Sequence, residues 1–463
     1  MIVPHRAARL AAGLLALTFG HSFGARAAMA QRAGGMGLAD RARAEQQAPR
    51  PDSTTTSWEV GGLTIIHRRA AANQIVVANL YLLGGSRQVT AATAGVEPML
   101  LAVSERGTAN FSRDALRQRL ARSGSQIVTA VQRDWSLLSL RSTREAFAES
   151  WAGFADRIVA PRLEPADVAV VRDQLVAGVR QRRDSPESWA EHLADSVTYA
   201  GHPYGVDPIG TEQSLRALDA DALRAYHRAE FVTSRMLLVI VGDVTRPVID
   251  SLVTATFATL PTGQYRWTLP DTLPRRPTDL VRDDRNLATN YLAGYAPGPR
   301  AGHPDYAALR VATAILSGEL FGEVRSRQAL TYAVAAPFKE QAVGTVGLTV
   351  STTEPEAALV AMRNVTLELQ RIVIDPRALG PLILLFITEY FLNNETNAAQ
   401  ADFLARAQLY EGDWRRHADF ARALRAVTPA DIQRVLRTYY RDLQFAYVGD
   451  PAKLDPAVVR GAR

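Results

Sequence analysis

The chain contains no cysteine in its 463 residues, so disulfides, thiol nucleophiles and cysteine-ligated metal sites are all excluded. Lysine is scarce as well: it occurs only at Lys339 and Lys453, and arginine supplies the other positive charges. The arginines are interspersed with acidic residues, and the formal net charge is only +6. A nucleic-acid-binding surface needs basic residues clustered on one face, so we expect no nucleic-acid partner.

No later segment has an apolar run long enough to span a membrane, so we also expect no membrane span. The N-terminal residues 1–30 have the pattern of a secretory signal peptide. Arg6 and Arg9 precede a short apolar run, 10–19, and Ala28-Met29-Ala30 is typical of a cleavage site. We therefore predict cleavage after Ala30 and a periplasmic or secreted protein.

The segment that follows, residues 31–56, is rich in small and polar residues and has no apolar periodicity, which predicts a disordered leader. Residues 57–262 then carry the periodicities of strands and amphipathic helices. Two alternating stretches that meet at Arg133-Asp134 predict an antiparallel hairpin, and the buried-type strand before Gly242 closes this first lobe.

Prolines recur through residues 263–283, which predicts an extended linker. Residues 284–452 then repeat the order of strand, helices, strand pair, long helix and closing strand. Both halves end in Val-Gly-Asp, beginning at Val241 and Val448. The sequence therefore predicts an α+β fold of two homologous lobes, each a mostly antiparallel sheet packed with helices.

The window 95–108 has the outline of a zinc-peptidase helix. It resembles the motif G-x-x-H-x-x-E-H-x-x-x-x-G-T of the insulinase/pitrilysin (inverzincin) family, in which two histidines bind zinc and the glutamate activates water. In this chain Pro98 and Ala102 stand at the histidine positions, and Leu101 stands at the glutamate position. The resemblance places the family's third ligand, a glutamate on a later helix, near Val179.

Proline and alkyl side chains have no electron pairs to donate to a metal, so we expect this chain to bind no cofactor. No two of its eight histidines stand three or four residues apart, and no G-x-S-x-G motif indicates a serine nucleophile. Glu97 and Glu105, which flank the degenerate motif positions, are predicted to be solvated charges on the helix.

A second resemblance lies at residues 321–332, which are similar to the family's segment L-F-x-x-L-R-E-x-x-G-L-A-Y. In that family the arginine and the tyrosine face the zinc across the chamber, hold substrate and help to stabilise the oxyanion. Arg325 and Tyr332 match their spacing, and Ala329 replaces the usual glycine. Guanidinium and phenol groups are suitable donors to a carbonyl that gains charge. The alternative is an ordinary helix-terminal charge and a half-buried strand residue.

The resemblance covers residues 57–452 and implies a half-length, processing-peptidase-like member without the zinc motif, which forms half of a clamshell. In heterodimers of that family, one subunit binds zinc and the other lacks the ligands. The leading hypothesis is therefore the non-zinc subunit of a periplasmic metallopeptidase, with a zinc-bearing homologous subunit and unfolded peptides as partners. Arg325 and Tyr332 would act in trans. The alternative is a non-catalytic scaffold or peptide-binding protein with the same fold.

Overall fold

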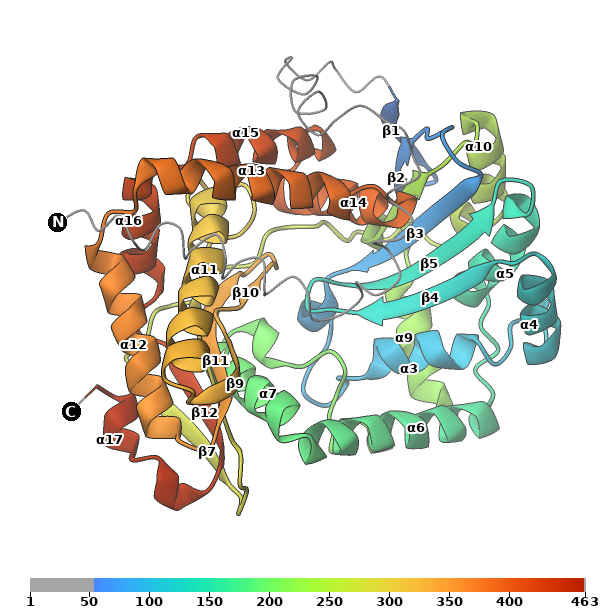
Figure 1. The fold of residues 1–463 in the computed structure, drawn as a ribbon. Helices are drawn as coiled ribbons and strands as arrows, with labels where there is room; N and C mark the ends of the chain where they lie inside the picture. The colour runs from blue at the N-terminus through green and yellow to red at the C-terminus, as the bar shows by residue number, and fades with distance from the viewer. Residues whose placement is uncertain (1–53, 462–463) are drawn as a thin grey trace.

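The computed structural model describes residues 54–461, and these form two lobes that lie side by side, each built on a six-stranded sheet (Figure 1). The predicted α+β fold is confirmed. The predicted signal peptide and leader residues 31–53 lie outside the described residues. The predicted leader ends too late, however, because the first strand already begins at Thr55 and pairs with the strand that follows it.

The first sheet has the order β1-β2-β6-β3-β5-β4. Its strands are β1 (Thr55–Val60), β2 (Leu63–Arg68), β3 (Ile75–Leu83), β4 (Gln126–Val131), β5 (Trp135–Thr143) and β6 (Met236–Val241). The α-helices of this half are α3 (Val96–Ser104), α4 (Arg113–Arg122), α5 (Phe147–Val159), α6 (Pro165–Asp184), α7 (Pro186–Thr198), α8 (Glu212–Ala217), α9 (Ala220–Glu230) and α10 (Arg246–Ala255). The predicted hairpin is the antiparallel pair β4–β5.

The second sheet has the order β10-β11-β8-β12-β7, and β9 also pairs with β11. Its strands are β7 (Leu280–Asp284), β8 (Asn290–Pro297), β9 (Thr331–Ala335), β10 (Phe338–Lys339), β11 (Thr345–Thr352) and β12 (Gln444–Gly449). Its α-helices are α11 (Tyr306–Leu320), α12 (Pro355–Arg371), α13 (Pro376–Asn393), α14 (Asn397–Glu411), α15 (Asp419–Arg425), α16 (Pro429–Tyr439) and α17 (Pro456–Val459). A π-helix, η5 (Phe321–Arg327), follows α11 directly.

The strand pairings confirm that the second half repeats the first. In the first sheet β2 and β6 are parallel, whereas β6–β3 and β3–β5 are antiparallel. In the second sheet β7 and β12 are parallel, whereas β12–β8 and β8–β11 are antiparallel. Each lobe therefore consists of one parallel strand pair within a mostly antiparallel sheet, and the two Val-Gly-Asp segments occur at equivalent central strands.

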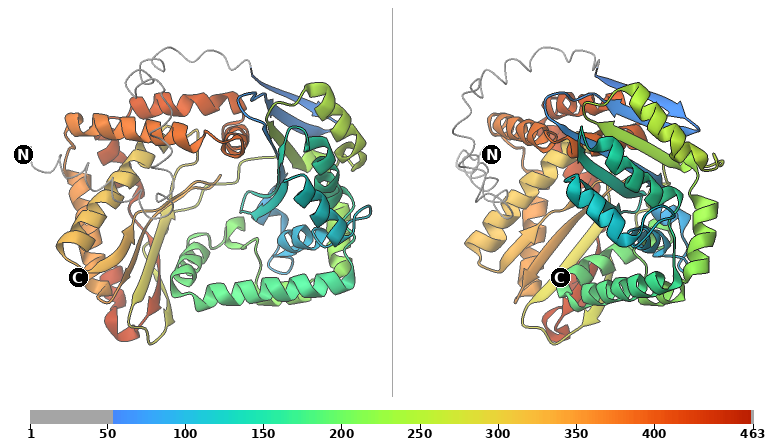
Figure 2. Two further views of the ribbon diagram at one scale, coloured as in Figure 1. Left: turned by 45° about the vertical axis from the view of Figure 1, so that its right-hand side comes forward. Right: turned by 90° about the vertical axis from the view of Figure 1, so that its right-hand side faces the viewer.

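Each half also lends one helix to the other half's sheet, which the sequence did not reveal. Side chains of β3 alternate between two cores: Val76 and Leu80 face the first lobe's own helices, whereas Val77 and Tyr81 face α14. In the same way α7 packs on β8 and β12 of the second sheet. Figure 2 shows α6–α7 and α13–α14 running along opposite sides of the molecule. This exchange fixes the two lobes relative to each other.

The predicted linker contains no helix or strand from 261 to 279, but β7 begins within its predicted range, at Leu280. Side-chain contacts also hold this segment against both lobes. The indole nitrogen of Trp267 donates to the carbonyl of Leu409 at 2.8 Å, and the Arg87 guanidinium lies 4.6 Å from the Trp267 ring centre. The extended segment is therefore a packed strap. Within residues 54–461, none of the helices combines the length and apolar character needed to cross a bilayer.

Candidate functional site

Apolar side chains occupy the positions that match the family's zinc ligands and catalytic glutamate. Helix α3 starts after Gly95, whose φ of 95° and close approach to Leu215 leave no room for a side chain. Leu101 is 2% exposed and belongs to the first lobe's core. Ala102 and Val179 are partly buried and pack against the same core, so that α3 and α6 meet through apolar contacts.

A buried cation lies at the end of the same helix. Arg157 is 2% exposed, and its guanidinium donates to the carbonyl of Leu101 at 2.7 Å and to the hydroxyl of Ser104 at 3.1 Å. Burial lowers the pKa of Arg157 to about 10, which leaves it positively charged at neutral pH. A divalent cation bound beside α3 would be repelled by this charge.

The residues at this position therefore do not fit zinc, since Pro98, Leu101, Ala102 and Val179 offer no ligand atom and a cation lies close by. Throughout residues 54–461, no group of three or more histidine, aspartate or glutamate side chains is arranged to hold a metal ion.

The prediction for Glu97 is wrong, whereas Glu105 is solvated as predicted, with 63% of its side chain exposed. Glu97 is 2% exposed and forms a buried ion pair with Arg235. Its carboxylate also accepts hydrogen bonds from Ser136 and, at 2.6 Å, from the hydroxyl of Tyr226. Its partners lie on β5, on α9 and on the residue just before β6, all distant in sequence, so no local pattern could reveal the pair.

Arg235 stays positively charged in this network. Burial alone would lower the pKa of Arg235, but the charge of Glu97 and the hydroxyl of Tyr226 raise it above its ordinary value. Burial and the same carboxylate raise the pKa of Tyr226. The network thus joins α3, α9 and the residue before β6 around the buried Glu97–Arg235 pair. These contacts hold α3 in place without a metal.

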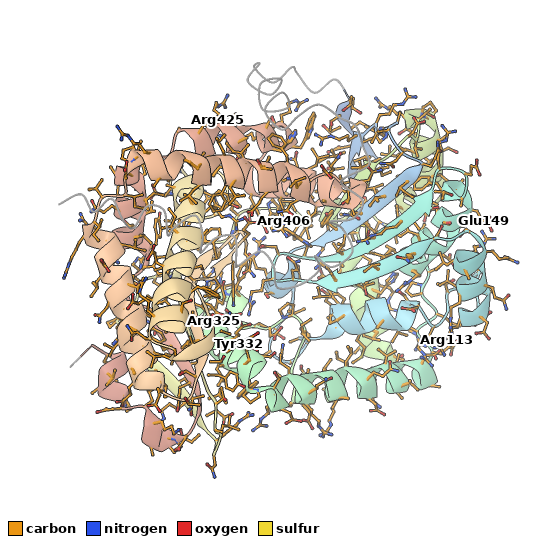
Figure 3. The ribbon with its side chains drawn as sticks, in the orientation of Figure 1. Arg113, Glu149, Arg325, Tyr332, Arg406 and Arg425 are labelled. Atoms are coloured by element: carbon orange, nitrogen blue, oxygen red, sulfur yellow. The ribbon has the colours of Figure 1, made fainter. Side chains whose placement is uncertain are left out.

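Arg325 and Tyr332 are brought together in the second lobe. The Arg325 guanidinium carbon lies 4.5 Å from the Tyr332 ring centre and 4.6 Å from the Phe321 ring centre. Tyr332 is 81% exposed, which contradicts the alternative of a half-buried strand residue. Figure 3 shows both labelled side chains together in the second lobe, beside its sheet. Among the described residues, no carboxylate pairs with Arg325.

The backbone under this pair is irregular. The π-helix η5 places Arg325, and the chain then passes through Ala329, whose φ is +51°. A left-handed conformation is unfavourable for alanine, and it occurs where the family motif has glycine. Single π-helical turns and strained residues gather at functional sites. The local geometry presents a guanidinium and a phenol to solvent, where they can donate hydrogen bonds to a carbonyl or an anion.

Sequence reasoning missed the polar junction between the lobes. Asp134, predicted only as a hairpin-turn residue, is 1% exposed. Its carboxylate accepts hydrogen bonds from the hydroxyls of Tyr204 and, at 2.7 Å, Tyr410, and from the backbone of Ala342 at 3.0 Å. Three separate segments are thereby tied to the β4–β5 turn. The Asp134 contacts keep α14 and the second lobe in register with the first sheet.

Known proteins resemble this chain in both sequence and fold. Residues 217–377 match the family model described as peptidase M16 inactive domain. An uncharacterised zinc protease of Mycobacterium leprae is 23% identical over 304 residues, which are 63% of this chain and 67% of that protein. The crystal structure of a peptidase M16 inactive domain from Pseudomonas fluorescens superposes with a TM-score of 0.79 at 20% identity and covers 87% of this chain and 99% of that one.

The periplasmic protease PqqL from Escherichia coli superposes with a TM-score of 0.73 at 14% identity. The match covers 87% of this chain but only 46% of that one. The present fold therefore corresponds to rather less than half of that longer protein.

Proposed function

Since this chain belongs to the peptidase M16 (insulinase/pitrilysin) family but lacks the family's zinc ligands, we propose that it is the non-zinc subunit of a heterodimeric periplasmic metallopeptidase. A homologous partner subunit supplies the zinc and the general base. The present chain closes half of the chamber, binds unfolded peptide and supplies Arg325 and Tyr332 in trans. The observation that carries this proposal is the stacking of the half-buried Arg325 on the exposed Tyr332 in a chain whose own metal position is filled.

The pair is suited to bind a peptide carbonyl whose oxygen gains negative charge. Arg325 presents a planar set of donors, and Tyr332 presents a single hydroxyl donor. The stacking of the guanidinium on the tyrosine ring limits the freedom of both side chains before substrate arrives. Donors oriented in advance stabilise developing charge more effectively than donors that must reorganise. Because the residues at this chain's own metal position offer no ligand atom, the pair would assist a reaction centred on the partner subunit.

Two similarities support the partner and the compartment. The match to less than half of PqqL supports a second chain that completes the clamshell. PqqL is described as periplasmic, and residues 1–30 of the present chain have a signal-peptide pattern. We propose the same compartment for this protein.

Co-expression with a zinc-bearing homologue tests the role in trans. We expect Arg325→Ala to lower kcat/KM for an unfolded peptide by about 100-fold, as the loss of one charge-stabilising donor does, with Tyr332→Phe affecting the same step less. Arg327→Ala is the matched control, because Arg327 lies on the same π-helix and forms an ion pair with Glu323. Unchanged cleavage by both site variants, in complexes with full zinc content, would show the trans role to be wrong.

The alternative is a scaffold or peptide-binding protein without catalytic function. The filled metal position and the buried Glu97–Arg235 pair favour it, because both stabilise the fold and neither performs chemistry. Light scattering of the purified chain, alone and with a zinc-bearing homologue, discriminates the two. A chain that self-associates and does not bind the homologue would be a scaffold. A one-to-one complex with the homologue supports the heterodimeric peptidase.

A further inference from the structure

A cavity of about 490 Å³ lies in the second lobe among α11, α13, α14 and α15. Neither Arg325 nor Tyr332 lines it, and Arg406, which does, is well separated from them in Figure 3. The volume falls within the range of small-ligand sites. Six rings supply much of the wall: Tyr306, Phe386, Tyr390, Phe403, His417 and Phe420.

A ligand in the cavity would contact mainly the faces and edges of these rings, because their polar atoms are already hydrogen-bonded. The Tyr390 ring lies 5.1 Å from that of Phe403 and 5.2 Å from that of Phe420, at steep interplanar angles of 69° and 51°. The Tyr390 hydroxyl donates to the carbonyl of His417 at 2.7 Å, and the Tyr306 hydroxyl donates to Glu340. Because both phenols are already engaged, the aromatic wall is available mainly through its π-systems, which attract cations.

One carboxylate in this wall differs from the others. Five carboxylates line the cavity, and four of them have an arginine within reach: Glu340 with Arg310 at 3.1 Å, Asp402 with Arg406 at 2.6 Å, Glu411 with Arg416 at 3.9 Å and Asp419 with Arg422 at 2.7 Å. Glu389 on α13 has no ion pair or side-chain hydrogen bond among the described residues. Burial raises the pKa of Glu389, and the charge of Arg310 opposes that rise.

We infer that this cavity binds an organic cation, the guanidinium or alkylammonium group of a basic ligand, with its charge on Glu389 and its stem along the aromatic wall. A half-buried carboxylate without a partner gains most from a cationic ligand, and surrounding rings add cation–π attraction. Either an arginine side chain of a peptide or a free small amine carries this chemistry. The inference concerns the isolated chain and does not rest on the proposed peptidase role.

Isothermal titration calorimetry on the full mature chain tests the inference with three probes. These are the blocked pentapeptide Ala-Ala-Arg-Ala-Ala, the same peptide with citrulline in place of arginine, and L-argininamide. Citrulline keeps the shape of arginine and removes its charge. We expect the arginine peptide to bind at least about ten-fold more tightly than the citrulline peptide, and Glu389→Gln to abolish that difference.

Glu395→Gln is the matched control, because Glu395 is exposed just beyond the same helix and does not line the cavity. Glu389→Gln breaks no ion pair or side-chain hydrogen bond of the described residues and should fold normally. Glu389→Asp, which keeps the charge, should retain part of the preference. Equal binding of the two peptides, no binding of either, or an unchanged preference in Glu389→Gln would overturn the inference. L-argininamide binding as tightly as the peptide would identify a free amine as the source, and peptide-only binding a peptide side chain. Because no zinc subunit is present, failure here is separate from failure of the cleavage assay.

Discussion

The two regions that resemble the halves of one active site differ in how they use their side chains. Around α3, the positions of the family's zinc site are apolar: Leu101, at the position of the catalytic glutamate, is 2% exposed, and the neighbouring Glu97 is buried in an ion pair. At η5 and β9, Tyr332 is 81% exposed, and Arg325 stacks on it above a strained turn. In the first region the side chains are buried and stabilise the fold. In the second region an aromatic ring is exposed, although burial of that ring would favour stability.

This difference supports the proposal that the second region, and not the first, has a function. A position without a catalytic or metal-binding role can accept any residue that stabilises the fold. The degenerate motif positions of α3 hold apolar residues of this kind. A region that keeps a π-helix, a left-handed alanine and an exposed tyrosine departs from the local rules of stability, and such departures are expected at functional sites. We therefore expect substitutions near α3 to alter stability and substitutions at Arg325 and Tyr332 to alter activity.

The largest effect is expected at the buried ion pair. Glu97→Ala leaves the Arg235 charge without its closest carboxylate, and such a loss costs about 3–5 kcal/mol of the free energy of unfolding. Urea unfolding followed by circular dichroism measures it. Glu105→Ala is the control, since this exposed side chain lies 3.9 Å from its nearest cation and is worth less than about 1 kcal/mol.

A double variant separates the pair's charge from its packing. Glu97→Met with Arg235→Met removes both charges and keeps similar volume, so most of the lost stability should return. If the double variant is as unstable as Glu97→Ala, the loss of stability comes from side-chain packing and not from an unpaired charge. That result would contradict the role given to the ion pair.

A smaller effect is expected at Asp207, which ties α6 to α7. Arg182 donates to its carboxylate at 2.7 Å, and His192 lies 3.4 Å from the same oxygen. Burial alone would raise the pKa of Asp207, but the His192 hydrogen bond and the charge of Arg182 hold it well below its ordinary value. Asp207→Asn should therefore cost about 1.5–3 kcal/mol at neutral pH.

The pH dependence of this variant follows from the direction of the shift. Because the folded pKa is depressed, the stabilisation is fully present above the unfolded pKa of about 4 and is lost as pH falls toward the folded pKa. The difference between Asp207→Asn and the wild type should shrink in acid. Asp221→Asn, whose carboxylate is 90% exposed, should show less than about 0.5 kcal/mol at any pH. A difference at Asp207 that is constant with pH would contradict the assignment.

The sequence predicted the repeat and the main strands because apolar periodicity and turn residues are local signals. It also brought Arg325 and Tyr332 forward as candidates, because a family segment with the same local spacing resembles residues 321–332; their role in a site stays a prediction. It could not predict the Glu97–Arg235 pair or the Asp134 junction, since each joins residues more than 50 positions apart. The helix exchange was missed for the same reason: α7 and α14 are amphipathic whichever sheet they cover. The burial of Glu97 within α3 and the exposure of Glu105 just after it depend on tertiary packing.

Ala329 gives a smaller effect of opposite sign. A left-handed φ costs alanine about 1–2 kcal/mol, and glycine avoids that cost but loses about 0.5–1 kcal/mol through its freer unfolded chain. Ala329→Gly should therefore raise the free energy of unfolding by up to about 1 kcal/mol. Ala333→Gly, at an exposed position of β9, should lower it by about 0.5–1 kcal/mol. Equal destabilisation by both would show that Ala329 is not strained.

The smallest stability effect is expected at Tyr332 itself. Tyr332→Phe removes a hydroxyl from a side chain that is 81% exposed, so the free energy of unfolding should change by less than about 0.5 kcal/mol. Tyr226→Phe makes the same chemical change in the buried network, where the hydroxyl donates to Glu97 at 2.6 Å, and should cost about 1.5–3 kcal/mol. Comparable losses in the two variants would mean that Tyr332 supports the fold. Stability retained with cleavage by the complex impaired would place the hydroxyl in the chemistry, because no intramolecular contact would remain to explain the loss.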